Sequence, residues 1–193
     1  ACMTDQYAVI GNPIEHSKSP QIHAAFAAQT GQDLNYGRIL GDIEDFEGEV
    51  RDFARSGGRG LNVTVPFKER AFRLADEITP RAESAEAVNT LIALEPISAE
   101  GDEQSPRFRG DNTDGVGLIT DLGCNHLFRL EGARILLLGA GGAARGVTRP
   151  LLESGPQQLV IANRTAAKAL SLAGNMAQYG TVTGWGFDEL LSQ

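Results

Sequence analysis

Cysteine and histidine are scarce in this chain, which contains 2 cysteines and 3 histidines. Cys2 and Cys124 cannot form a disulfide framework or a C-x-x-C site. The histidines show neither H-x-x-x-H nor H-E-x-x-H spacing, so we expect no bound metal. His16 is interpreted as a hydrogen-bonded structural residue rather than as a ligand or a catalyst.

Long apolar runs and clusters of basic residues are also missing. The most apolar stretch, residues 135–144, is about half as long as the roughly 20 residues that a membrane helix needs, and glycines interrupt it. The first residues lack a basic segment followed by an apolar one, which argues against secretion. The formal net charge is −8, so neither nucleic acid nor a membrane is an expected partner. We expect a cytoplasmic protein.

Strand-like and helix-like segments alternate along the chain, which predicts an α/β protein with a largely parallel first sheet. The expected strands cover residues 7–10, 34–40, 60–65, 87–94, 108–110, 135–138, 159–162 and 182–184. One helix is expected to start at residues 19–20 and another at 187. Five further helices are expected over residues 46–54, 69–76, 115–122, 143–153 and 166–179. A surface loop over 95–107 is expected between the hairpin strands 90–94 and 108–110.

A glycine-rich turn separates the apolar strand at 135–138 from the helix that follows. Its residues fit the pattern G-x-G-x-x-G/A and are Gly139, Ala140, Gly141, Gly142, Ala143 and Ala144. In this position Gly139 permits a tight turn, Gly141 lets the backbone approach a pyrophosphate, and Ala144 lets the helix pack closely. The alternative is a glycine turn needed only for packing. The context favours a Rossmann-type dinucleotide-binding domain, of which only three of the usual about six strands are present.

The end of the next expected strand indicates which dinucleotide is bound. An NAD site usually has Asp or Glu there, whereas this chain has Asn163, Arg164 and Thr165, with Lys168 one turn later. Arg164 can form a forked pair of hydrogen bonds with a 2′-phosphate. Solvated charges at an exposed helix start are the alternative. The sequence therefore favours NADP as the cofactor.

Three polar clusters remain that a nucleotide-binding fold does not explain. They cover residues 11–20, 62–68 and 111–115, each beside the end of an expected strand. Polar groups gathered beside a cofactor domain are suited to a small polar substrate.

Together with Ala87-Val88-Asn89-Thr90, these clusters resemble the motifs of the shikimate dehydrogenase family, closely and in order from residue 7 onward. The resemblance implies a substrate-binding catalytic domain over residues 1–114 and the N-terminal part of an NADP-binding domain over 115–193, flanking a cleft. It also implies reversible NADPH-dependent reduction of 3-dehydroshikimate to shikimate, on the route to chorismate and aromatic amino acids. The protein would be a monomer or a homodimer.

The resemblance further implies a role for each matched residue. Ser17 and Ser19 would bind the substrate carboxylate, and the ring hydroxyls would contact Thr64, Lys68, Asn89 and Asp114. Lys68 and Asp114 would form the catalytic pair. A free lysine has a pKa near 10.4 and is a poor base at neutral pH, and a nearby carboxylate favours the ammonium form. We therefore expect Lys68 to act mainly as a proton donor in the reductive direction.

Structural roles are possible for the same residues. Ser19 is a suitable N-cap for the helix at Pro20, and Asp114 could cap the helix at Gly115. Lys68 could be an ordinary solvated lysine.

The family's C-terminal stretch is absent from this chain, so we expect uncovered apolar helix faces and sheet edges. Two other functions stay open. The chain could be an inert fragment that retains only substrate binding, or a relative that also uses quinate, which Arg164 disfavours because such relatives often use NAD.

Overall fold

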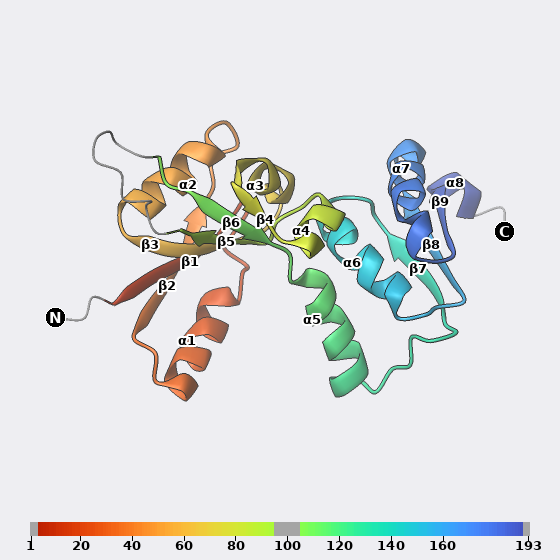
Figure 1. Ribbon diagram of the computed structural model, residues 1–193, viewed down its shortest axis with the longest axis horizontal. Coiled ribbons are helices and arrows are strands. Elements are labelled where there is room, and N and C mark those ends of the chain that lie inside the picture. Colours follow the sequence, from red (N-terminus) through yellow and green to blue (C-terminus); the bar gives the residue numbers. More distant parts are fainter. Residues whose placement is uncertain (1–3, 95–104, 191–193) are drawn as a thin grey trace. The chain divides into compact units, whose positions relative to one another are not determined.

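The computed structural model describes residues 4–94 and 105–190, and Figure 1 shows their helices and strands. The chain divides into two compact units. The first comprises Ala1–Glu83 and Val88–Asp111, and the second comprises Ser84–Ala87 and Asn112–Gln193. Most of the loop predicted over 95–107 lies outside the described residues. Within the described part of the chain, no helix is long and apolar enough to cross a membrane.

Up to Asp111 the chain forms a mixed sheet with helices on both faces. The elements in order are β1 (Asp5–Gly11), α1 (Ser19–Thr30), β2 (Leu34–Leu40), α2 (Phe46–Arg55), β3 (Gly58–Val63), α3 (Lys68–Leu74), β4 (Glu77–Ile78), α4 (Pro80–Ala85), β5 (Thr90–Ala93) and β6 (Phe108–Asp111). The strand order is β2-β1-β3-β5-β6-β4. Strand β1 is parallel to β2 and β3, and β4 is parallel to β6. Strand β5 is antiparallel to β3 and β6, because β5 and β6 form the predicted hairpin.

Alternation along β1 separates the two faces of this sheet. Ala8 and Ile10 point into a core that also contains Phe46 and Val50 of α2. Tyr7 and Val9 therefore face the opposite side, because successive side chains of a strand alternate. Figure 1 shows α1 on this second side and α2 on the first. We call the second side the α1 face.

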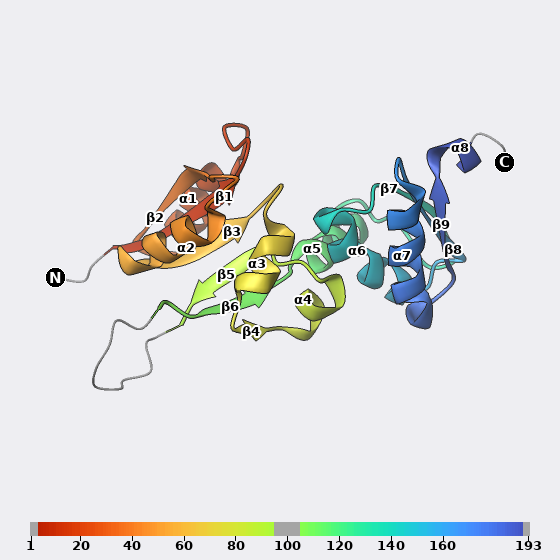
Figure 2. The same ribbon diagram turned by 90° about the horizontal axis from the view of Figure 1, so that it is seen from above.

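The second unit contains a smaller, fully parallel sheet. Its elements are α5 (Asp114–Thr120), the π-helix η1 (Asp121–Asn125), β7 (Arg134–Leu138), α6 (Gly142–Glu153), β8 (Gln158–Asn163), α7 (Ala166–Met176), the 3-10 helix η2 (Ala177–Tyr179), β9 (Val182–Gly186) and α8 (Phe187–Leu190). The order is β7-β8-β9, and both pairs are parallel. Helices α6 and α7 bury their apolar faces in one core with β8 (Figure 2). Edge strand β7 exposes Leu136 and Leu138.

The N-cap roles considered for Ser19 and Asp114 are wrong, because each residue lies one position after the N-cap. Ser19 is the first residue of α1, and Lys18 takes the N-cap position. Asp114 is likewise the first residue of α5, and its N–H donates to Oδ1 of Asn112 at 3.1 Å. The hydroxyl of Ser19 and the carboxylate of Asp114 therefore do not serve as N-caps.

An ion pair between Arg70 and Glu47 joins α2 to α3, and its contribution to the stability of the first unit can be tested. Arg70 Nε lies 2.8 Å from Glu47 Oε1, and the guanidinium stands 5.5 Å from the ring centroid of Phe46. The hydrogen bond from Arg70 lowers the pKa of Glu47. The carboxylate therefore contributes stability above the unfolded pKa of about 4.3, and this contribution is lost as the pH falls through the lower folded value.

We expect Glu47→Gln to reduce the free energy of unfolding by about 1 kcal/mol at neutral pH, because the pair is partly shielded from water. The difference in the free energy of unfolding between the variant and the unsubstituted protein should shrink as the pH falls and the Glu47 carboxylate becomes protonated. Urea unfolding at several pH values measures this difference. Glu15→Gln, at an exposed carboxylate, is the control. An equal loss of stability at neutral and acidic pH would contradict the role of the Glu47 charge.

Candidate active site

The loops that follow β1, β2 and β3 are tied together at one edge of the first sheet. Asn12 N–H donates to Val65 O at 2.9 Å, and the Asn12 side chain donates to Gly41 O at 2.9 Å. A Cβ atom on Gly11 would lie 2.3 Å from Cγ2 of Thr64, so glycine is needed for this close approach. The carboxyl ends of parallel strands thus place Thr64 beside the loop that carries Ser17 and Ser19.

The two serine hydroxyls converge within this loop. Ser17 Oγ lies 3.2 Å from Ser19 Oγ and also accepts the Ser19 N–H at 3.3 Å. Arg38 of β2 holds the Ser17 carbonyl oxygen with donors at 2.7 and 3.1 Å. Both serines are half-buried. Two hydroxyls at this spacing can each donate to one oxygen of a carboxylate.

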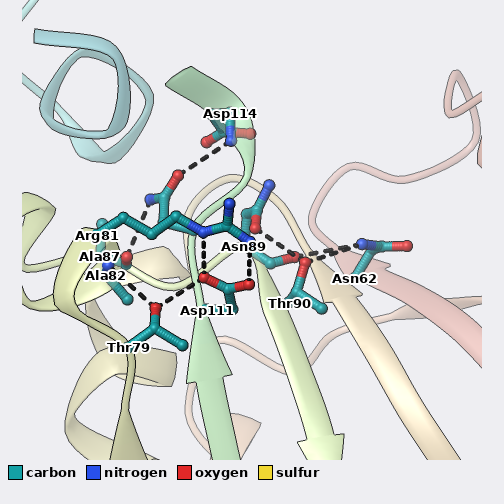
Figure 3. A network of polar contacts seen from close by, with 10 residues as sticks. Asn62, Thr79, Arg81, Ala82, Ala87, Asn89, Thr90, Asp111 and Asp114 are labelled. Carbon is teal, nitrogen blue, oxygen red and sulfur yellow. Dashed lines mark hydrogen bonds and ion pairs between the residues drawn. The ribbon is translucent and has the colours of Figure 1, made fainter. Parts of the chain in front are cut away.

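A second polar group lies where β3 pairs with β5. Asn89 is 9% exposed, and its Oδ1 accepts the Thr90 hydroxyl at 2.9 Å. Asn62 Nδ2 reaches Thr90 Oγ1 at 3.4 Å and Asn89 O at 3.5 Å, as Figure 3 shows. This network fixes the Asn89 amide next to the sheet edge.

Lys68 opens α3 directly after the polar turn that ends β3. Its side chain is half-buried, and its carbonyl oxygen accepts the N–H of Val88 at 2.9 Å. This bond ties Lys68 to the segment that carries Asn89. Lys68 is therefore fixed at the same sheet edge as Thr64 and Asn89.

The cluster at 111–114 divides into structural and candidate catalytic residues. The Asp111 carboxylate accepts Thr79 Oγ1 at 2.7 Å and Arg81 Nε at 2.6 Å, which anchors the end of β6 (Figure 3). Asn112 is 3% exposed, and its amide donates to Ala87 O at 2.9 Å. Asp114 is half-buried and begins the second unit's first helix.

The first unit thus brings together most of the predicted substrate residues. Ser17, Ser19, Thr64, Lys68 and Asn89 all follow strands of one sheet or stand at strand ends, whereas Asp114 belongs to the second unit. His16 is exposed.

Sequence reasoning assigned no site role to Tyr36, Arg38 or Asn62, although the structure connects all three to this group. Asn62 stood within a recognised motif and could have been found. Tyr36 and Arg38 lie on β2. The contact of Tyr36 with Asn62 and that of Arg38 with the serine loop depend on the strand order, which the sequence does not reveal.

The glycine turn of the second unit has the geometry expected for a pyrophosphate site. Gly139 has a φ of 110°, which favours glycine. A Cβ atom on Gly141 would meet nothing within 4 Å, so no protein atom fills the space in front of it. Ala140 and Ala144 are buried and pack α6 against the sheet. The first N–H groups of α6 lack intrahelical acceptors and can bind an anion.

The turn after β8 presents basic side chains to solvent. Arg164, Thr165 and Lys168 are exposed, and the Asn163 amide braces the turn by donating to Thr165 O at 3.0 Å. These residues fit a 2′-phosphate, because none of the four carries negative charge.

Comparison with known proteins identifies the family. Residues 9–91 match the shikimate dehydrogenase substrate binding domain, and residues 121–190 match the shikimate / quinate 5-dehydrogenase domain. The chain is 54% identical to the shikimate dehydrogenase (NADP(+)) of Cellvibrio japonicus over 97% of its own length, and it spans 64% of that relative.

Two solved structures agree with this assignment. An Ael1 enzyme from Pseudomonas putida is 44% identical, with a TM-score of 0.79, 98% of this chain covered and 66% of that one. The shikimate 5-dehydrogenase of Thermus thermophilus, solved with NADP(H) and shikimate, is 33% identical, with a TM-score of 0.77, 93% of this chain covered and 62% of that one. The chain therefore belongs to the shikimate dehydrogenase family.

Proposed function

We propose that this chain is part of an NADP-dependent shikimate dehydrogenase, which reversibly reduces 3-dehydroshikimate to shikimate in the cytoplasm. The observation that carries the proposal is the convergence of the Ser17 and Ser19 hydroxyls beside Thr64, Lys68 and Asn89 at one sheet edge. The two-domain match to named shikimate dehydrogenases supports it.

Each side chain has a role that suits its chemistry. The serine hydroxyls donate to the substrate carboxylate, and Thr64 and Asn89 bind ring hydroxyls. Asn89 is suited to this task because its amide is buried and held by Thr90, so its orientation is set before substrate binds.

When bound, NADPH would supply the hydride for reduction of the carbonyl, and NADP⁺ would accept it in the reverse oxidation. In reduction, Lys68 donates a proton to the oxygen of the substrate carbonyl as the alcohol forms, and in oxidation it takes that proton back. Asp114, which belongs to the second unit, is the other residue of the proposed catalytic pair, and its carboxylate is suited to accepting a hydrogen bond from a ring hydroxyl. Residues 139–144 would hold the pyrophosphate, and the 2′-phosphate would be bound by Asn163, Arg164, Thr165 and Lys168.

The preference for NADP over NAD is tested by replacing Arg164, whose guanidinium is proposed to bind the 2′-phosphate. We expect Arg164→Gln to weaken NADP binding about tenfold, because a charged hydrogen bond to phosphate is lost, and to leave NAD binding unchanged. Calorimetric titration with both dinucleotides measures the effect. Arg129→Gln, at another exposed arginine of the same unit, is the control. Equal losses of affinity for NADP and NAD would show that Arg164 does not bind the 2′-phosphate.

One set of assays distinguishes the proposed enzyme from the two alternatives, an inert fragment and a quinate-using relative. An inert fragment would gain thermal stability from shikimate without turning it over. A quinate-using relative would oxidise quinate as readily as shikimate and would accept NAD. The proposed enzyme is stabilised by shikimate, oxidises it, and prefers shikimate and NADP to quinate and NAD. Sedimentation velocity distinguishes a monomer from a homodimer.

A further inference from the structure

Arg38 of β2 binds the main chain of the serine loop, the segment over residues 12–19 that carries Ser17 and Ser19. Its Nε and Nη2 both donate to the carbonyl oxygen of Ser17, at 3.1 and 2.7 Å. Nη2 also donates to Oε1 of Gln21 in α1 at 3.3 Å. A single guanidinium therefore ties an edge strand of the first sheet to the serine loop and to the start of α1.

The strand register explains why Arg38 reaches this loop. Strand β1 is paired in parallel with β2 and ends with Gly11 opposite Leu40, so the serine loop begins beside the end of β2. Side chains two residues apart on a strand point to the same face of a sheet. The ring of Tyr36 stacks on that of His23 in α1 with a centroid distance of 4.1 Å, so Tyr36 and Arg38 both point to the α1 face.

The main chain of Ser17 lies outside α1 and is held from two sides. The N-cap of α1 is Lys18, whose carbonyl oxygen accepts the N–H of Ile22 at 3.1 Å. Ser17 therefore precedes the hydrogen-bond ladder of the helix. Its N–H donates to the carbonyl oxygen of buried Ile14 at 3.0 Å, and its own carbonyl oxygen accepts from Arg38. Arg38 thus supplies the second of these two anchors.

The position of this main chain sets the spacing of the two serine hydroxyls. Ser17 Oγ accepts the Ser19 N–H at 3.3 Å and lies 3.2 Å from Ser19 Oγ. A shift of the Ser17 main chain would change both distances together. Two hydroxyls that donate to one carboxylate bind it best when their spacing is fixed before the ligand arrives. An anchor on the Ser17 carbonyl oxygen therefore prepares the pair for a carboxylate.

We infer that Arg38 is a positioning residue for carboxylate recognition, acting through the main chain of Ser17. The inference rests on the proposed function, because it takes the substrate carboxylate to be the ligand of the two serines. Arg38 does not touch the substrate in this account. Its forked pair of donors holds the Ser17 carbonyl oxygen, and the fixed loop then presents both hydroxyls.

The first test is Arg38→Gln, which removes the fork from an exposed position of the strand. We expect shikimate to bind about threefold to tenfold more weakly, because the spacing of the hydroxyls is no longer fixed. Isothermal titration with shikimate measures the dissociation constant. Arg55→Gln is the matched control, because it removes an exposed arginine from α2, on the opposite side of the same sheet (Figure 1). Unchanged affinity in Arg38→Gln would overturn the inference.

Arg38→Lys distinguishes the fork from the positive charge. A lysine keeps the charge, but its single ammonium group on a flexible stem cannot supply two donors in a fixed plane. We expect Arg38→Lys to bind shikimate nearly as weakly as Arg38→Gln does. Affinity equal to that of the unsubstituted chain would show that a nearby cation is sufficient, and the positioning role would be wrong.

A ligand-free measurement keeps the inference separate from the proposed function. Amide hydrogen exchange of Ser17 and Ser19 reports how firmly the loop is held. We expect exchange to be about threefold to tenfold faster in both Arg38 variants and unchanged in Arg55→Gln, with the amides of β1 unaffected throughout. If the unsubstituted chain fails to bind shikimate, the proposed function fails and these exchange rates alone decide. Rates that Arg38→Gln leaves unchanged would contradict the positioning role.

Discussion

Replacing Lys68 by methionine is expected to lower the turnover of shikimate by a factor of about 10² to 10⁴, the usual contribution of a positioned proton donor or acceptor. Methionine has similar length and no proton to transfer. Lys68 opens α3 and its backbone is bonded to Val88, so the substitution changes the side chain without removing that anchor. Steady-state rates of NADP reduction with shikimate measure the effect, and shikimate binding by calorimetry reports whether the site survives.

Two further variants complete this prediction. Arg73→Met removes an exposed cation from the same helix and should leave the rate unchanged. If Lys68 and Asp114 act as a pair, the double variant Lys68→Met/Asp114→Asn should be hardly slower than Lys68→Met alone. A Lys68→Met variant with nearly normal turnover would refute the proton-transfer role and would leave Lys68 as an ordinary solvated lysine.

Gly141→Ala is expected to weaken NADP binding by about tenfold to a hundredfold while the fold is kept. The structure separates the two effects. Gly141 has an ordinary φ of −89°, and a Cβ atom there would contact no protein atom within 4 Å. An added methyl group would therefore occupy only the space through which a pyrophosphate approaches the backbone.

The matched control is Gly174→Ala on α7, where a Cβ atom also has no neighbour within 4 Å. Alanine should stabilise that helix slightly and should not change NADP affinity. Thermal unfolding and calorimetric titration measure both properties. If Gly141→Ala bound NADP as tightly as the unsubstituted chain, the glycine turn would serve packing alone.

Much of the fold was predictable because hydrophobic alternation and turn residues act locally. The strand at 34–40, for example, follows directly from such local signals. The short strand β4 and the helix α4 were not predicted. Strand β4 spans only Glu77–Ile78 and is defined by its pairing with β6, so no local periodicity marks it.

The candidate site was predictable only as far as its residues lie in motifs. Ser17, Ser19 and Asn89 could be named from the sequence, whereas Tyr36 and Arg38 could not, because they lie outside the motifs. Tyr36 reaches Asn62 across β1 because β2 and β3 flank that strand, and this arrangement is a property of strand order rather than of spacing. The capping roles were wrong. Each helix begins one residue earlier than expected, so Ser19 and Asp114 are first helical residues, and the N–H of Asp114 is bonded by Asn112 Oδ1.

The central claim is tested most directly by incubating the purified chain with shikimate and NADP and following the near-ultraviolet absorbance of NADPH. We expect shikimate-dependent NADPH formation that is lost in Lys68→Met and is much slower with NAD. If no NADPH forms and shikimate and NADP also fail to raise the melting temperature of the chain, the proposed substrate and cofactor sites are contradicted.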